Sequence, residues 1–131
     1  MKRLVAVLLV LAALLCAADR KRKPAKPPEL EVLEAKAQRV EGRMLVDGRV
    51  RNTGEKPIVS LNLLFDFMNT DAQAVTTRRY AFEDEVLGLG QEAGFQLYLA
   101  DPVRAVTFQV RAETGRGMDL RVAHAGPFPI E

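Results

Sequence analysis

The feature that most constrains the fold is the spacing of the apolar residues, which mostly recur at every second position. This period is typical of strands with one face in a core and one face in water. The alternating runs are Met44 to Val50, Leu61 to Phe67, Phe95 to Leu99, Val106 to Val110 and Met118 to Val122. Turn-forming residues separate them, and no long helical pattern intervenes. These observations predict an all-β, immunoglobulin-like antiparallel β-sandwich of about seven strands.

One segment within the predicted domain favours a different structure. In "ELEVLEAKAQRVE", the apolar residues Leu30, Leu33, Ala37 and Val40 stand at helical spacing. Its Glu, Leu, Ala and Lys residues are also good helix formers. Local propensity therefore predicts a helix over residues 29–41, within a chain that otherwise reads as strands.

The first 18 residues have the layout of a secretory signal peptide. Two positive charges precede an apolar run from Leu4 to Leu15, and small residues follow up to Ala18. We expect cleavage near Ala18 and a periplasmic or secreted protein. Two alternatives stay open: a lipidated Cys16, or an uncleaved membrane anchor through residues 4–18.

Residues 19–28 form a basic, proline-punctuated linker, whereas residues 29–131, the predicted sandwich domain, carry four more acidic than basic residues. Clustered cations attract anionic lipid surfaces. We therefore hypothesise that the linker holds the domain weakly to such a surface. An acidic domain with few aromatic residues indicates no nucleic-acid partner. The cationic residues of the linker are Arg20, Lys21, Arg22, Lys23 and Lys26.

The residue types needed for most enzyme chemistry are scarce. Once Cys16 is removed with the signal, the chain has no cysteine for disulfides, metal thiolates or nucleophiles. Ser60 is the only serine and His124 the only histidine, and no Gly-x-Ser-x-Gly motif surrounds the serine. We predict no enzyme activity and assign no catalytic or cofactor-binding residue.

Two residue sets include metal-ligand types, but neither has the spacing of a metal site, so we assign no metal ligand. Met and His suit copper, but their spacing lacks a tight His-x-Met arrangement, and Met44 and Met118 fall on predicted core faces. Oxygen ligands in "FMNTDAQ" lack the late Glu of a calcium loop, so a solvated hairpin turn is expected there. The acidic run at Glu83 to Glu85 is interpreted as a charged loop or strand edge. The candidates are Met44, Met68, Met118 and His124 for copper, and Asp66, Asn69 and Asp71 for calcium.

The stretch Asn52-Thr53-Gly54 follows one alternating run and precedes "EKP". Asn can bond its own backbone and Gly supplies positive φ, so the trio is predicted to turn a strand-to-strand corner.

Three motifs give a family resemblance: "GRVRN" (Gly48 to Asn52), "LLFD" (Leu63 to Asp66) and "LGLGQEAGFQLYL" (Leu87 to Leu99). Together they resemble the FxLYD-type domain of bacterial envelope and exported proteins, with Phe65 at the position of its tyrosine. The resemblance implies that residues 30–40 are a first strand. It also implies a module carried by exported proteins.

We therefore expect a non-catalytic binding or adaptor module of the bacterial cell envelope, with an unidentified envelope protein as partner. The alternative is a periplasmic carrier of copper, calcium or a small ligand. Candidate contact segments are Ala125 to Ile130 and the loop from Glu83 to Glu92.

Overall fold

The computed structural model describes residues 26–131. The predicted signal peptide, Cys16 and the cations at positions 20–23 lie outside this range, whereas Lys26 lies within it and is exposed. Within residues 26–131, no helix has the length and apolar character needed to cross a membrane.

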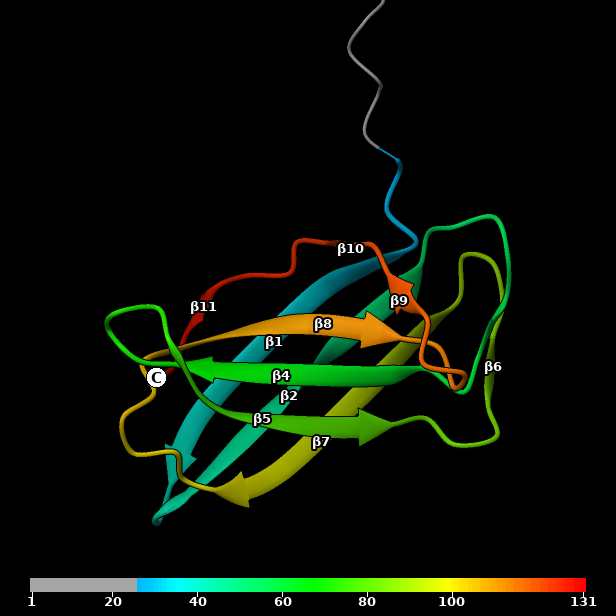
Figure 1. The fold of residues 1–131 in the computed structure, drawn as a ribbon. Helices are drawn as coiled ribbons and strands as arrows, with labels where there is room; N and C mark the ends of the chain where they lie inside the picture. The colour runs from blue at the N-terminus through cyan, green and yellow to red at the C-terminus, as the bar shows by residue number, and fades with distance from the viewer. Residues whose placement is uncertain (1–25) are drawn as a thin grey trace, which may run out of the picture.

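The domain is a β-sandwich, as the alternation predicts (Figure 1). The first sheet has the order β10-β1-β2-β7 and the second the order β11-β8-β4-β5, with β9 also paired to β8. The pairs are antiparallel except that of β1 with β10. The first sheet consists of β1 (Leu30–Val40), β2 (Arg43–Asn52), β7 (Glu92–Ala100) and β10 (Val122–Ala123). The second consists of β4 (Asn62–Met68), β5 (Ala74–Ala81), β8 (Thr107–Glu113), β9 (Asp119–Leu120) and β11 (Phe128–Pro129), and a two-stranded ribbon joins β3 (Ile58–Val59) to β6 (Val86–Leu87).

The predicted core faces are confirmed for four of the five alternating runs. Side chains on these faces are almost fully buried in β2, β4 and β8, and mostly buried in β7. Phenylalanine rings from both sheets meet at the centre, where the centroids of Phe65 and Phe95 lie 5.3 Å apart and those of Phe65 and Phe108 6.3 Å apart. Such tilted aromatic contacts contribute beyond their buried area. The core is therefore continuous between the sheets.

The segment Leu30–Val40 is a strand, so the helix predicted from local propensity is wrong and the strand implied by the family resemblance is confirmed. It forms ten residue pairs with β2, and a bulge between Val32 and Glu34 shifts the register by one residue. The bulge changes the alternation: Leu30 and Val32 are buried before it and Ala37 after it, an odd separation that a regular strand does not produce. Pairing along the whole of β2 outweighs a helix propensity that amounts to tenths of a kcal/mol per residue.

In the fifth alternating run, Met118 to Val122, the predicted core face is only partly confirmed. The strand breaks into β9 and β10, and Met118 lies in the preceding turn with 67% of its surface exposed, not on a core face. Leu120 and Val122 pack against the core from its rim. Val106, predicted at the start of a core face, is 40% exposed and lies just before β8, which begins at Thr107.

The chain's last residues close one side of the sandwich. β11 pairs with β8 of the second sheet, while Ile130 forms an isolated bridge to Ala37 of the first. The amide of Glu131 donates to the carbonyl of Ala37, and its carbonyl accepts from the amide of Arg39. The two sheets are thus connected by backbone hydrogen bonds along this side.

Candidate functional site

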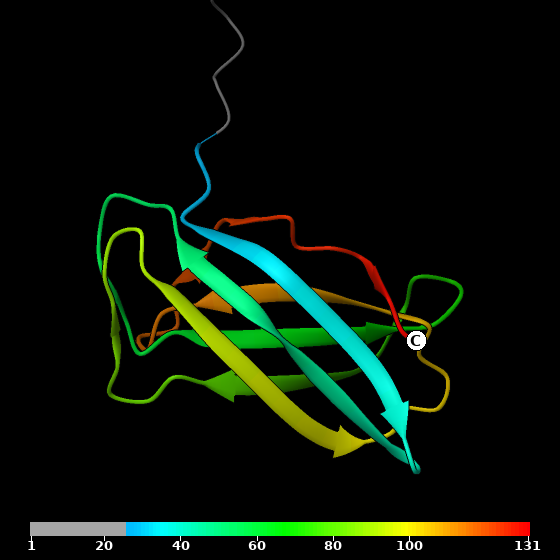
Figure 2. The same ribbon diagram turned by 180° about the vertical axis from the view of Figure 1, so that it is seen from behind.

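The opposite side of the sandwich is open. β5 is the last strand of the second sheet and β7 the last strand of the first. In the two opposite views, both are the outermost strands on the same side of their sheets, and they cross at an angle (Figures 1 and 2). Within residues 26–131, β5 pairs only with β4 and β7 only with β2, so each strand has one side free of backbone pairing.

β7 has few of the features that normally protect an edge strand. Proteins usually protect such strands with lysines, prolines, bulges or short length. β7 is nine residues long, it pairs with β2 over nine consecutive residues without a register shift, and all its residues after Glu92 are uncharged and none is proline. The strand is therefore a regular template whose outer side has an unbroken row of backbone donors and acceptors without strand partners in the described part of the chain.

β5 is protected in the usual way. Arg78 and Arg79 stand next to each other, so each face of the strand carries a cation. A register shift at its first pair with β4 bends its beginning. Of the two free edges, β7 is therefore the one suited to receive another strand.

The side chains of β7 add apolar surface to this edge. Tyr98 on its outer face is 61% exposed. On its inner face, Leu97 packs against the core but is only partly buried, and Tyr80 of β5 also packs there, with its ring centroid 6.3 Å from that of Phe95. An added strand would extend the sheet and cover Leu97.

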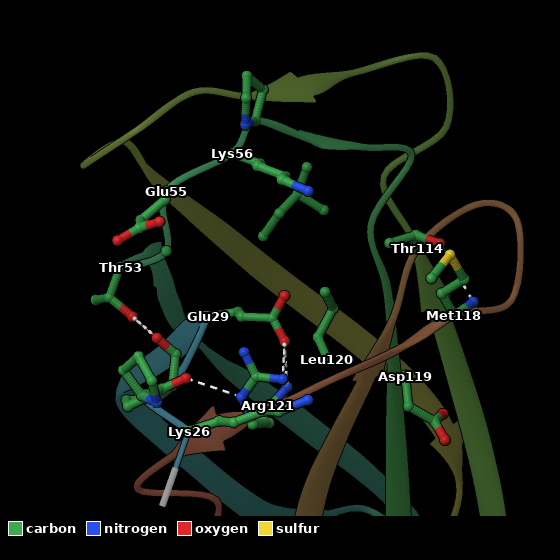
Figure 3. A pocket seen from close by; sticks show the side chains of 15 residues that line it. Lys26, Glu29, Thr53, Glu55, Lys56, Thr114, Met118, Asp119, Leu120 and Arg121 are labelled. Carbon is green, nitrogen blue, oxygen red and sulfur yellow. Dashed lines mark hydrogen bonds and ion pairs between the residues drawn. The ribbon is translucent and has the colours of Figure 1, made fainter. Parts of the chain in front are cut away.

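A groove of about 710 Å³ lies at the end of the sandwich where residues 26–29 join it (Figure 3). Glu29 organises one wall: its carboxylate accepts from the backbone amide of Arg121 and forms an ion pair with that guanidinium at 3.2 Å. The carbonyl of Glu29 also accepts from the amides of Thr53 and Gly54. Glu29 and Arg121 form the one ion pair among the charged lining residues that the structure describes, and since these comprise three cations and three acids, the groove has no cluster of one charge.

The predicted corner at Asn52 is confirmed. Its buried side-chain amide donates to the carbonyls of Lys56 and Leu87, both at 2.9 Å, and its Oδ1 accepts from the amide of Gly54 at 3.0 Å. The expectation of positive φ at Gly54 is wrong, since that residue has an ordinary backbone conformation. Asn52 is thus a structural residue that holds the corner to the β6 segment.

Asp66 is almost fully buried on the outer face of the second sheet. Arg111 donates to it through Nε at 2.6 Å and Nη2 at 3.0 Å, and the hydroxyl of Thr77 donates at 2.7 Å. The Arg111 hydrogen bonds hold the pKa of the Asp66 carboxyl below its usual value, against the opposing effect of burial. Because the guanidinium side chain of Arg111 covers this carboxylate, the group has the features of a structural ion pair.

The structure does not gather the copper candidates. Met44 is buried in the core, Met68 lies beside the first residue of β8, and Met118 lies beyond the other end of that strand. The exposed imidazole of His124 faces the carboxylate of Glu31 at 3.6 Å. Among residues 26–131, no group of three or more His, Cys, Asp or Glu residues is placed to hold a metal ion.

The other sequence candidates occupy turns. The Oδ1 of Asn69 accepts from the amides of Asp71 and Gln73, which makes the segment a hairpin turn, as expected. Ser60 occupies the bend before β4 with a φ of 52°, away from any strand centre. The acidic residues at positions 83–85 are exposed in the turn after β5, as predicted for a charged loop.

The two predicted contact segments have different positions. Ala125 to Ile130 does contain an edge strand, β11, but this segment closes the sandwich side described above. The loop from Glu83 to Glu92 contains β6, which pairs with β3. Sequence reasoning missed the edge of β7. The signal was nonetheless present, since eight uncharged residues run from Ala93 to Ala100.

No protein-family model and no curated protein matches the chain. Among solved structures, a β-glucuronidase from glycoside hydrolase family 2 superposes with a TM-score of 0.51 at 10% identity, over 78% of this chain and 13% of that one. The putative ApaA protein from Bordetella pertussis (TM-score 0.42, 15% identity) matches over 79% of this chain and 100% of its own. A β-glucosidase from Kluyveromyces marxianus (TM-score 0.43, 18% identity) matches over 82% and 15%. The likeness to the β-glucuronidase concerns the fold alone.

Proposed function

We propose that this protein is an exported, non-catalytic binding module of the bacterial cell envelope that takes up an extended strand at the free edge of β7. The observation that carries the proposal is the unprotected edge itself, nine residues long and uncharged after Glu92. Long edges of this kind are normally blocked, because they pair readily with other chains. An exposed one is therefore suited to binding.

Strand addition divides recognition between backbone and side chains. Main-chain hydrogen bonds along the edge supply affinity, while alternate side chains supply specificity. On the inner side, an incoming apolar residue would cover Leu97 beside Tyr80, both now partly buried. On the outer side, it would contact Tyr98. The favoured partner segment is thus extended, with apolar residues on its inner face.

A photo-crosslinking residue placed at Gln96, in the middle of β7, tests the binding site in intact cells of the native host. Gln38 on β1 is the matched control, because it is exposed and lies on the same face of the same sheet but away from the free edge. We expect a discrete crosslinked product from position 96 and none from position 38. Equal products, or none from either position in a folded and exported protein, would refute binding at β7.

The basic linker belongs to the same proposal as a weak tether to the anionic envelope surface, supported by its five cations and by the exposure of Lys26. Replacing all five cations by Gln should lower co-sedimentation of the protein with anionic lipid vesicles and leave its low background with neutral vesicles unchanged. Unchanged binding to anionic vesicles would remove the tether from the proposal.

A further inference from the structure

We infer that the strand received by β7 is the β7 of a second copy of this chain, in an antiparallel, two-fold symmetric pair. This inference rests on the proposed function, because it names the occupant of the same edge. It follows from the order of side chains along β7, which is complementary to itself.

Two-fold symmetry and pairing over the full length of the strand together determine the register. Antiparallel β7 strands that pair over their full length have the middle residue, Gln96, opposite its own copy. Side chains of the two inner faces then pair with each other, as do those of the two outer faces, so the apolar alternation is preserved. Any register displaced by one residue would place core-facing side chains opposite outward-facing ones.

On the outer face, this register places Tyr98 of one copy opposite Gly94 of the other. Glycine weakens a strand because it has no side chain to pack, and a cross-strand aromatic ring can cover it. Space is available at Gly94: the nearest atom to a Cβ built there is the carbonyl oxygen of Gly48, at 3.8 Å. By symmetry, the contact occurs twice.

Charge is complementary at the ends of the pair. Glu92 is the only charged residue of the strand, and it comes opposite the small Ala100 of the other copy. Ala100 is paired on its other side with Arg43 of β2. Glu92 already pairs with Arg49 of its own copy at 3.3 Å. Strands lie about 4.8 Å apart, so Arg43 of the other copy would approach the same carboxylate over Ala100 as a second cation. No like charges face each other along β7.

On the inner face, Phe95 comes opposite Leu97 of the other copy, and Ala93 opposite Leu99. The partly exposed Leu97 is thereby covered by an aromatic residue that already belongs to a core. A foreign strand would need to supply these features independently, whereas a second copy contains all of them.

Disulfide trapping tests the register directly. In the full chain with Cys16→Ser, an introduced cysteine is the only one present. Opposed residues of antiparallel strands have Cα atoms about 4.5 or 5.5 Å apart, within the range of about 4.4–6.8 Å that a disulfide spans. Gln96→Cys should therefore form a covalent dimer under mild oxidation. Glu92→Cys should not, since the two positions would be about 27 Å apart along the ladder.

A mixture of the Glu92→Cys and Ala100→Cys proteins completes the test, because this register brings those positions together. We expect mixed disulfides in the mixture and little dimer from either variant alone. Equal trapping at positions 92 and 96, or no trapping at position 96 in a folded protein, would overturn the inference.

Light scattering with size separation measures the untrapped pair. Gln96→Lys places two lysines opposite each other and should shift the protein to monomer, whereas Gln38→Lys adds the same charge away from the edge and should leave the dimer unchanged. A wild-type protein that stays monomeric at the highest concentration would refute the second copy. If position 96 still crosslinks to another protein in cells, the proposed function stands. If position 96 crosslinks to no protein, the inferred dimer and the proposed binding function are both refuted.

Discussion

Neutralising Asp66 is the sharpest test of how the outer face of the second sheet is held. Its carboxylate receives two N–H groups from Arg111, at 2.6 and 3.0 Å, and the hydroxyl of Thr77 at 2.7 Å. In Asp66→Asn the size is kept, but the amide presents N–H groups where Arg111 also donates. One of the two Arg111 contacts is then lost, and the other no longer involves a charged acceptor.

The expected cost follows from the geometry. Hydrogen bonds to charged groups contribute about 1.5–3 kcal/mol each. Asp66 is only 9% exposed at its side chain, but Arg111 is 52% exposed, so water replaces part of what the guanidinium loses. We expect a loss of about 2–3 kcal/mol in the free energy of unfolding. For a domain of this size, the melting temperature should fall by roughly 10–20 °C.

The stabilisation that Asp66 contributes should decrease as the pH falls. The pKa of Asp66 is lowered by folding from its usual value of 3.8. Its contribution to stability is therefore present above pH 3.8 and is lost as the pH falls through the lower pKa of the folded state. The stability difference between wild type and Asp66→Asn should be constant near neutrality and shrink progressively below pH 4.

Urea denaturation followed by circular dichroism, at pH 7 and again near pH 3, measures the loss in the free energy of unfolding and its dependence on pH. Glu34→Gln is the matched control: its ion pair with Arg49 is 52% exposed on both sides and should contribute less than about 1 kcal/mol. The reasoning is refuted if Asp66→Asn costs no more than Glu34→Gln at pH 7, or if its cost is undiminished at low pH.

Two further substitutions test the corner and the bulge. Asn52→Ala should cost about 2–4 kcal/mol in thermal unfolding, because it leaves two carbonyls without their buried donor, and a cost below 1 kcal/mol would contradict the structural role. Gly48→Ala should cost about 3 kcal/mol, because its Cβ would collide with the carbonyl oxygen of Glu34 and come within 2.7 Å of the Phe95 ring. Gly94→Ala, in open space, should change stability by less than about 1 kcal/mol, and equal losses for the two glycines would remove the steric explanation.

The alternation of apolar residues is a strong predictor wherever a strand is regular. It identified the buried faces of β2 and β4 because burial on one face leaves a period of two. It failed at β1 because a single bulge changes which residues face inward, and at Met118 because the chain leaves the sheet before that residue. A bulge or a break leaves no repeating pattern in the sequence. Its position is set by the pairing with neighbouring strands.

The free edge of β7 could not be predicted from local sequence patterns, because it too depends on which strands pair. The inner face of β7 alternates as regularly as that of β4, although within residues 26–131 β4 has two neighbouring strands and β7 only one. Position within a sheet is set by pairing between distant segments, which no local pattern contains. The corner at Asn52 was recognisable because turn chemistry is local, but its bond to the carbonyl of Leu87 spans 35 residues.

The attachment of residues 26–29 determines how the domain responds to mechanical load. Glu29 is bonded to both the corner at Thr53 and the segment at Arg121, so a pull on Lys26 is transferred directly to the start of β1. Ladder hydrogen bonds run perpendicular to the strands. A force along the axis of β1 therefore acts in shear on its ten pairs with β2, which resist together instead of opening one after another. Residues 26–29 thus join the sandwich at a point suited to bearing tension.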